Sequence, residues 1–166
     1  GELSECPIFI DDSPSLNVIQ LRAKCRRLQA EHNVGLVVID YLQLMHAHGH
    51  RENRVQEISE ITRSLKAIAR ELEIPVIAGA QLSRAIDSRP DQKPRLSDLR
   101  ESGSIEQDAD IVMFLYAEAS DSQHSGPLRM KAEIAKHRNG AVGEMDLVFL
   151  RNQGVFLPDR GVPPNL

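Results

Sequence analysis

The sequence predicts an α/β protein with a mainly parallel, twisted sheet that helices flank and that ends in an antiparallel edge. Three observations predict this fold class. Short apolar runs such as "GLVVID" (35–40) are typical of strands that are buried on both faces. Amphipathic helical patterns alternate with these runs in the first part of the chain, as in parallel sheets. In the last part, strand patterns follow one another directly, which indicates hairpins.

Length and composition fit a single domain with its own core. The chain has 166 residues, of which 41% are hydrophobic and 27% charged. No apolar run reaches the ~18 residues of a membrane span, and no signal-peptide pattern begins the chain, so we expect no membrane partner. The net charge of −4 means that nucleic-acid binding would need a local basic surface. Cys6 and Cys25 have no metal or redox spacing, which favours reduced thiols and a cytoplasmic protein.

The first predicted elements are a strand and a helix. "PIFIDDSP" predicts a short strand over residues 8–10, followed by a helix with Asp12 or Ser13 as its N-cap and Pro14 at the first helical position. The apolar residues of this helix recur every three or four positions, so they share one buried face. They are Val18, Leu21, Cys25 and Leu28. The strand over 35–40 follows.

The second helix has the clearest pattern in the chain. Its apolar stripe has helical spacing, with charged residues outside it. The stripe consists of Ile58, Ile61, Leu65, Ile68 and Leu72. Pro75 ends this helix, and "VIAGAQ" (76–81) predicts a second buried strand.

The remaining elements predict a third core strand and an antiparallel edge. A polar segment (82–95) and short helical turns around Gly103 precede the strand "IVMFLY" (111–116). Three later strands are predicted in "LRMKAEIAKHR", "GEMDLVFL" and "GVFLP", the last two as a hairpin. The proline-rich tail, 158–166, is predicted to be flexible.

Two polar residues stand at the ends of apolar strands and are candidates for chemistry. Asp40 and Gln81 each follow such a run, and the carboxyl ends of parallel strands form the ligand-binding edge of an open α/β sheet. An acid at this edge often holds Mg²⁺ on a nucleotide phosphate. The alternative is that each residue caps a helix or fixes a loop. None of the ten glycines precedes a lysine, so the chain lacks a phosphate loop. Either that loop precedes Gly1, or the protein is not an ATPase.

Several motifs resemble one known family. They are "VVIDYLQLM", "NRVQEISEITRSLKAIARELEIPVIAGAQLSRA", "KPRLSDLRESGSIEQDADIVMFLY" and "IAKHRNGAVGEMDLVFL". In this order they are similar to the RecA-like motor domain of bacterial replicative DNA helicases, the DnaB family, over about residues 8–150. The resemblance implies a RecA-like P-loop NTPase core in which residues 1–157 are the later part of the motor domain. The P-loop strand and helix would then precede this chain, and the chain alone would be inactive.

The resemblance assigns roles to four residues in ATP hydrolysis. Asp40 matches the acid that helps to hold Mg²⁺, and Gln81 matches the glutamine that senses the γ-phosphate. Lys136 and Arg138 match cations that reach the ATP of a neighbouring subunit. These two cations are two residues apart, so in a strand they point to the same side. The family usually has Gln where this chain has His137, whose side chain should point the other way.

The resemblance also implies a DNA-binding surface. "LRESGS" (99–104) resembles the loop that follows the DNA backbone, and the preceding loop adds further cations. The predicted DNA-binding residues are Arg84, Arg89, Lys93, Arg100, Glu101 and Gly103, with Arg95 nearby. No aromatic residue lies between Leu82 and Ala109, so phosphate contacts rather than base stacking are expected. The alternative for the cations of 82–95 is a solvated loop.

The implied whole is an ATP-driven helicase that encircles single-stranded DNA as a hexamer, with a primase and a helicase loader as partners. Two other functions stay open: a non-catalytic paralogue that serves as a scaffold, and a recombinase of the wider RecA group. Two further patterns have ordinary explanations. His46, His48 and His50 lack a fourth ligand for zinc. The basic stretch 22–27 fits a solvated helix face, with a contact to an adjoining subunit as the minor alternative.

Overall fold

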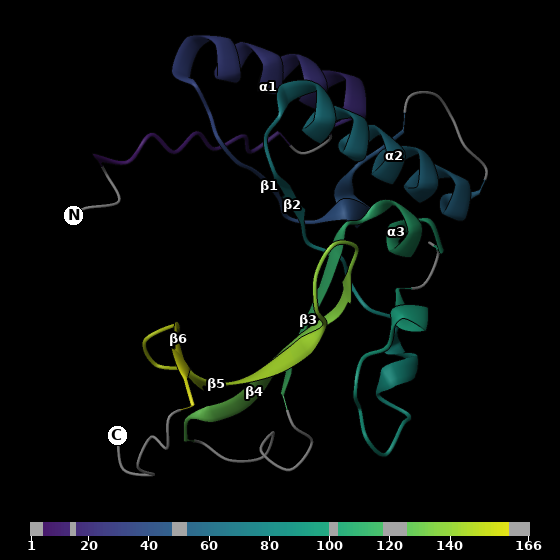
Figure 1. Cartoon of the computed structure of the whole chain (residues 1–166), viewed down its shortest axis with the longest axis vertical. Coiled ribbons are helices and arrows are strands. Elements are labelled where there is room, and N and C mark those ends of the chain that lie inside the picture. The colour runs from purple at the N-terminus through teal and green to yellow at the C-terminus, as the bar shows by residue number, and fades with distance from the viewer. Residues whose placement is uncertain (1–4, 14–15, 48–52, 100–102, 118–125, 160–166) are drawn as a thin grey trace. The chain divides into compact units, whose positions relative to one another are not determined.

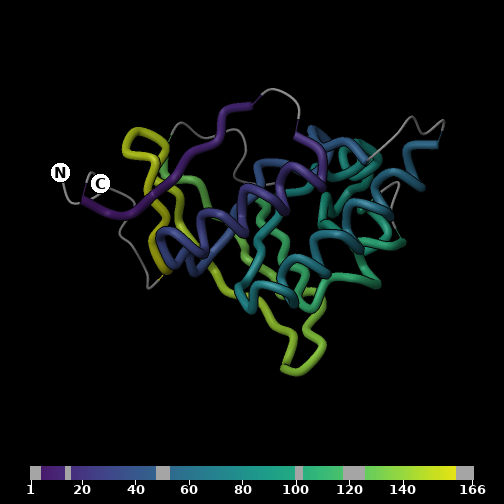
Figure 2. The backbone as a smooth tube through the Cα atoms, turned by 90° about the horizontal axis from the view of Figure 1, so that it is seen from above, coloured from purple at the N-terminus to yellow at the C-terminus, as the bar shows by residue number. Residues whose placement is uncertain are grey.

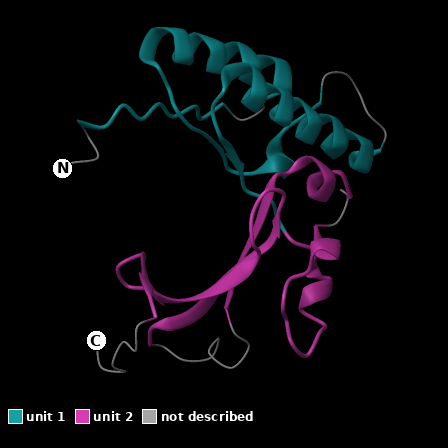
Figure 3. Cartoon of the chain, in the orientation of Figure 1, with its two compact units in different colours: residues 1–81 teal, residues 82–166 magenta. Residues whose placement is uncertain are grey.

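The computed structural model describes residues 5–13, 16–47, 53–99, 103–117 and 126–159. The chain divides into two compact units, residues 1–81 and 82–166 (Figure 3). Together they confirm an α/β protein with parallel and antiparallel strands. No helix in the described part of the chain is long and apolar enough to cross a bilayer.

The first unit holds two helices and a parallel strand pair. Its elements are α1 (Val18–His32), β1 (Val37–Ile39), α2 (Arg54–Leu72) and β2 (Val76–Ala78), with a 3₁₀ turn at Leu42–Leu44. β1 and β2 are parallel neighbours, and Val38 pairs with Ile77. The two helices lie side by side (Figure 1). The second predicted strand is shorter than expected, because pairing ends at Ala78 rather than Gln81.

The predicted apolar stripe of α2 is confirmed. Its five residues are all buried, and Ile61 has no exposed surface. Asn53 caps the helix by accepting a hydrogen bond from the Val55 amide, and Glu73 ends it in the left-handed conformation with φ 53°. Burial of this stripe against the rest of the first unit is the main stabilising contribution of the helix.

The predicted start of α1 was wrong, as was the strand over residues 8–10. The N-cap is Asn17, whose side chain accepts from the Gln20 amide (2.9 Å) while the Gln20 side chain accepts from the Asn17 amide (3.2 Å). This reciprocal capping box satisfies two amides at once, whereas Ser13 donates to Asp11 instead. Residues 8–10 are extended but join no strand among the described residues, and Pro14 lies outside them.

The second unit is built on an antiparallel sheet. Two 3₁₀ turns, Arg84–Ile86 and Leu96–Asp98, precede α3 (Gly103–Asp108). The strands β3 (Ile111–Ala117), β4 (Leu128–His137), β5 (Gly143–Leu150) and β6 (Val155–Pro158) then pair in chain order. The predicted hairpin of the last two strands is confirmed. β3 pairs antiparallel with β4, so among the named strands of the described residues β1 and β2 are the parallel pair, to which an isolated parallel bridge between Asn17 and His46 is added.

A β-bulge divides β4. Val112 pairs with Lys136 and Met113 with Ile134, so Ala135 has no partner on β3. Beyond the bulge, Lys136 and Arg138 lie in the last part of β4 and the turn that follows. This turn forms an extended loop between the yellow-green strands of Figure 2.

Candidate functional site

The first part of the candidate site is the carboxyl edge of β1 and β2. Asp40 follows β1 directly, and Gly79 to Gln81 follow β2. The Gly79 amide donates to the Ile39 carbonyl (2.9 Å), and the Leu42 amide donates to the Gly79 carbonyl (2.9 Å). A Cβ on Gly79 would lie 3.8 Å from Asp40 Oδ1. The two loops therefore run together, as the sequence predicted, and both Asp40 and Gln81 are exposed.

A residue that the sequence did not single out fixes the Gln81 loop. Gln43 Nε2 donates to the Gln81 carbonyl (3.3 Å), and Gln43 Oε1 accepts from the Gln81 amide (3.2 Å). Arg54 in turn donates to the Gln43 carbonyl (2.7 Å). The only signal in the sequence was a glutamine three residues after the strand-end acid. Gln43 therefore links the loop after β1 to the loop after β2 through the Gln81 backbone.

Arg54 belongs to a small charged cluster at the start of α2. It contacts Glu57, whose carboxylate also accepts from the Ala47 amide (3.2 Å) and lies 3.6 Å from His46 Nδ1. Burial opposes the charge of Glu57, but Arg54 and the Ala47 amide outweigh it and lower the pKa of Glu57. This cluster stabilises the segment that carries Gln43.

The second part of the candidate site is the end of β4. Lys136 Nζ donates to the carbonyls of Ala109 (2.8 Å) and Glu106. Arg138 donates to the Gln107 carbonyl (2.9 Å), and its guanidinium lies 3.5 Å from Asp110 Oδ1. Both cations therefore reach the C-terminal end of α3, where helix carbonyls favour positive charge.

The side of the strand on which these cations lie depends on the β-bulge. Strict alternation along β4 would place the side chains of Lys136 and Ile134 on the same face of the sheet. Because Ala135 is an extra residue, Lys136 pairs with Val112 and Ile134 with Met113, so the two side chains lie on opposite faces. The His137 ring contacts the Ala141 carbonyl (3.3 Å) instead of α3. The structure therefore brings Lys136 and Arg138 together and leaves His137 apart from them.

The predicted DNA-binding cations differ in their surroundings. Arg84 is exposed, and no described side chain is recorded as its partner. Arg89 pairs with the buried Asp98, and Lys93 pairs with Glu133 (3.2 Å). Gly103 is the first residue of α3, and within the part of the chain that the structure describes nothing lies within 4 Å of the position that its Cβ would take. Arg100 and Glu101 lie outside the described residues.

Two other sequence features have structural partners. Arg22 and Arg26 of the basic stretch on α1 both pair with Glu71 of α2, which lowers the pKa of Glu71. In the described part of the chain no group of three or more potential metal ligands comes together. His48 and His50 lie outside that part.

The exposed Asp40 carboxylate and the loop that carries Gln81 lie at the carboxyl edge of parallel strands, which is the edge where open α/β proteins bind ligands. Mg²⁺ prefers oxygen ligands, so the Asp40 carboxylate fits the Mg²⁺ ion that the family resemblance implies at this edge. The chain belongs to the DnaB-like helicase C terminal domain family, whose model matches residues 1–157.

Curated relatives agree with this family. The chain is 54% identical over 161 residues to the replicative DNA helicase DnaB of Geobacillus stearothermophilus, covering 95% of this chain and 35% of that protein. It is 50% identical over 172 residues to the replicative DNA helicase DnaC of Bacillus subtilis (strain 168), covering 99% and 38%. The chain thus spans little more than a third of the relatives that it matches.

Solved structures share the fold. One is a DnaB-like replicative helicase described with its interactions with primase, with a TM-score of 0.84, 41% identity and coverage of 94% of this chain and 38% of that one. Another is the structure of an ATPase domain, with the same TM-score and identity and coverage of 95% and 56%. The RecA-like fold expected from the sequence resemblance is confirmed at this level.

Proposed function

We propose that the chain forms part of the motor of an ATP-dependent replicative DNA helicase, which unwinds duplex DNA by moving along single-stranded DNA as a hexameric ring in the cytoplasm. The main support is the family membership together with relatives that are replicative helicases at 50% identity or more. The edge formed by Asp40 and Gln81 supports the same function, because it offers a carboxylate and an amide where such folds bind nucleotides.

In this proposal Asp40 would hold Mg²⁺ and Gln81 would face the phosphates of ATP. Bound Mg²⁺ neutralises charge on the phosphate oxygens during transfer. Gln43 keeps the Gln81 backbone in place through its two hydrogen bonds, so the amide side chain of Gln81 starts from a fixed point. A fixed starting point reduces the entropy that is lost when the amide contacts phosphate.

Lys136 and Arg138 would act on the ATP bound by a neighbouring subunit. Their contacts with the same end of α3 support this role, because two cations that lie close together can reach one triphosphate. In the isolated chain the carbonyls at the end of α3 occupy them. Contact with ATP would exchange these neutral partners for phosphate oxygens, which bind cations more strongly.

The DNA-binding surface would be formed by the region 82–103. Arg84 offers an exposed guanidinium to phosphate, and Arg100, Glu101 and Gly103 belong to the loop that resembles a backbone-tracking loop. Arg89 and Lys93 support this region through their acidic partners. A primase and a helicase loader are proposed as partners. The structural neighbour described with primase supports the first of these.

The test is the turnover of ATP by a chimeric helicase, in which residues 1–166 replace the matched segment of the Geobacillus stearothermophilus relative. We expect the chimera to hydrolyse ATP and to unwind a forked DNA. Arg138→Ala should reduce the kcat of ATP hydrolysis by about 10³-fold, the low end of the effect of an arginine supplied in trans, with ATP affinity nearly unchanged.

The matched control is Arg27→Ala, which removes an exposed arginine from α1. It should leave turnover unchanged. A chimera that assembles but neither hydrolyses ATP nor unwinds DNA would favour the scaffold hypothesis. If Arg138→Ala retains most of its turnover, the trans-acting role of Arg138 is wrong even where the chimera is an active helicase.

A further inference from the structure

We propose that Lys93 is a positioning residue that fastens the segment 83–98 to strands β4 and β5 through Glu133 and Glu144, and does not itself contact DNA phosphate. The inference rests on the proposed function, because this segment is part of the proposed DNA-binding surface. It changes the role that a basic loop residue would ordinarily be given, since cations in such loops usually bind phosphate.

The segment 83–98 is closed on itself by one buried acid. Asp98 is only 5% exposed, and its carboxylate accepts from the Arg95 amide (2.7 Å) and from the Arg89 guanidinium. The Ser83 amide donates to the Asp98 carbonyl (3.0 Å), which joins the two ends of the segment. A buried carboxylate needs such donors, so Arg89 has a structural partner that it cannot give up without cost. The segment is therefore one hydrogen-bonded piece.

Lys93 is the cation that connects this piece to the sheet. Its Nζ lies 3.2 Å from Glu133 Oε2 on β4 and 3.6 Å from Glu144 Oε2 on β5. The hydrogen bond with Glu133 raises the pKa of Lys93, so the lysine remains charged. One ammonium group thus bridges two adjacent strands.

The two glutamates are held by partners of their own. Tyr116 donates to Glu133 (3.4 Å), and Lys131 lies 3.5 Å from Glu144 and 2.8 Å from Asp146. These side chains come from three neighbouring strands and lie in two adjacent cross-strand rows, because Glu133 pairs with Glu144 while Tyr116 and Asp146 both pair with Lys131. The acids therefore present a fixed site for an ammonium group rather than two mobile surface charges.

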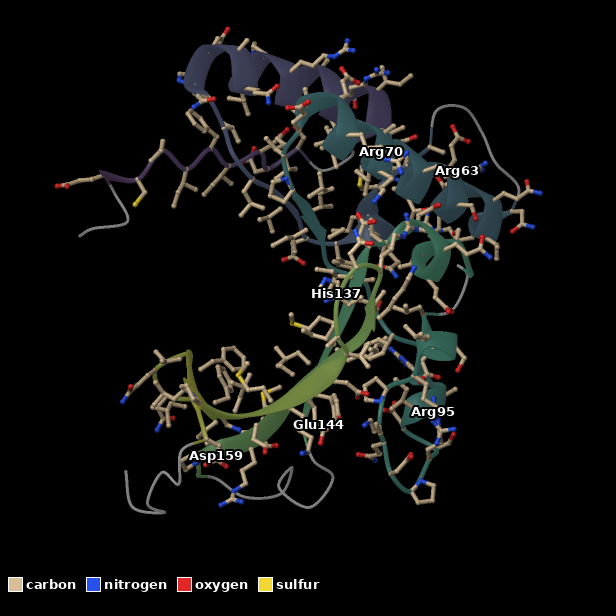
Figure 4. The ribbon with its side chains drawn as sticks, viewed as in Figure 1. Arg63, Arg70, Arg95, His137, Glu144 and Asp159 are labelled. Atoms are coloured by element: carbon tan, nitrogen blue, oxygen red, sulfur yellow. The ribbon has the colours of Figure 1, made fainter. Side chains whose placement is uncertain are left out.

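A cavity beside Lys93 makes the ion pairs important for the position of the segment. The cavity is about 430 Å³ and lies between the segment and the sheet, with Phe114 and Ile134 on the sheet side. Arg95 and Glu144, labelled in Figure 4, line it from the segment and from β5. Pro94 is buried and Phe114 is 3% exposed, so apolar packing also contributes to the contact between the two sides. Where the open space separates them, apolar packing is absent and the pairs made by Lys93 would fix the position of the segment.

A positioning role and a phosphate contact predict opposite results for one substitution. If Lys93 positions the segment, Glu133→Lys places two cations together, displaces the segment and weakens DNA binding. If Lys93 contacts phosphate, Glu133→Lys releases Lys93, adds a positive charge and leaves binding unchanged or stronger. The double variant that combines Lys93→Glu with Glu133→Lys has the ion pair but no cation at position 93. It should therefore bind DNA normally if Lys93 positions the segment, and weakly if Lys93 contacts phosphate.

The experiment measures two properties of the chimeric helicase: binding of an oligo-dT strand by fluorescence anisotropy, and amide hydrogen exchange over 83–98 without DNA. We expect Lys93→Glu and Glu133→Lys each to weaken oligo-dT binding about fivefold and to speed exchange, and the double variant to restore both. The milder Lys93→Gln should leave the salt dependence of binding unchanged. Arg84→Gln is the matched control. It should reduce the steepness of the plot of log affinity against log salt concentration by about 0.7, which corresponds to one lost phosphate contact on single-stranded DNA.

Other results would overturn the inference. They are unchanged or tighter binding in Glu133→Lys, no rescue of exchange in the double variant, or a lower salt slope in Lys93→Gln. Hydrogen exchange tests the fastening of the segment even without DNA. A wild-type chimera that binds no oligo-dT, or an Arg84→Gln variant with an unchanged slope, would instead count against the proposed DNA-binding function. The two failures are therefore distinguishable.

Discussion

At the scale of single residues, the side chains that are proposed to bind ligands and those that are proposed to position them differ in their partners. Asp40, Gln81 and Arg84 are exposed, whereas Gln43, Arg89 and Lys93 contact other parts of the protein. Asp40 and Gln81 were candidates from the sequence alone, because a polar residue after an apolar strand is visible as a pattern, and Arg84 was a candidate through the family resemblance. The sequence could not identify the second kind. The partner of Lys93, Glu133, lies far along the chain, and nothing local marks Gln43 as a link between two loops.

Gln43 provides a direct test of positioning at this scale. Gln43→Ala removes two hydrogen bonds to the Gln81 backbone, each of which contributes about 0.5–1.5 kcal/mol at most sites. We expect the kcat of ATP hydrolysis by the chimeric helicase to fall about tenfold. The KM for ATP should change little, because Gln81 is expected to act mainly on the transition state. Gln153→Ala, an exposed glutamine after β5, is the control, and equal rates in the two variants would contradict the role of Gln43.

At the scale of elements, periodicity predicted α2 well and the start of α1 poorly. The stripe of α2 is long enough for its spacing to identify the buried face without ambiguity. The N-cap of α1 depended on competition among several polar residues that could all serve as caps. Asn17 forms the cap because Gln20 completes a capping box, while Ser13 has a nearer partner in Asp11. Local patterns predict faces better than ends.

The buried face of α2 should carry most of its stability. Ile61→Ala removes a side chain with no exposed surface and should reduce the local stability of α2 by about 2–5 kcal/mol. Val55 is a matched control on the same helix, 45% exposed, and Val55→Ala should change stability by less than about 0.5 kcal/mol. Amide hydrogen exchange of α2 in the chimeric helicase measures both. Similar protection in the two variants would show that the stripe is not the stabilising face.

At the scale of the whole molecule, the chain leaves apolar strand residues in contact with solvent. Val38 and Ile77 pair across β1 and β2 and are 65% and 57% exposed. On the antiparallel sheet, Met113 and Met145 are 60% and 57% exposed. The sequence predicted strands buried on both faces, and these exposed fractions differ from that prediction. These apolar side chains therefore form exposed faces on both sheets.

Exposed strand faces of this kind should promote association of the isolated chain. We expect the chain to self-associate in sedimentation velocity as its concentration rises, because adjacent apolar side chains are stabilised by leaving water. Replacing both Val38 and Ile77 by threonine keeps β-branched side chains and should reduce the association. Val55→Thr, on the exposed side of α2, should have little effect. A wild-type chain that stays monomeric at all concentrations would contradict the prediction.

The bulge in β4 determines where this strand can lose a residue without a change in its pairing. Ala135 has no partner on β3, so its deletion would keep Ile134 opposite Met113 and Lys136 opposite Val112. Deletion of Ala132 instead would shift the residues between the deletion and the bulge by one position, so that their side chains point to the other face of the sheet. Glu133 would then point away from Lys93. A deletion series along β4 should therefore have its mildest member at Ala135.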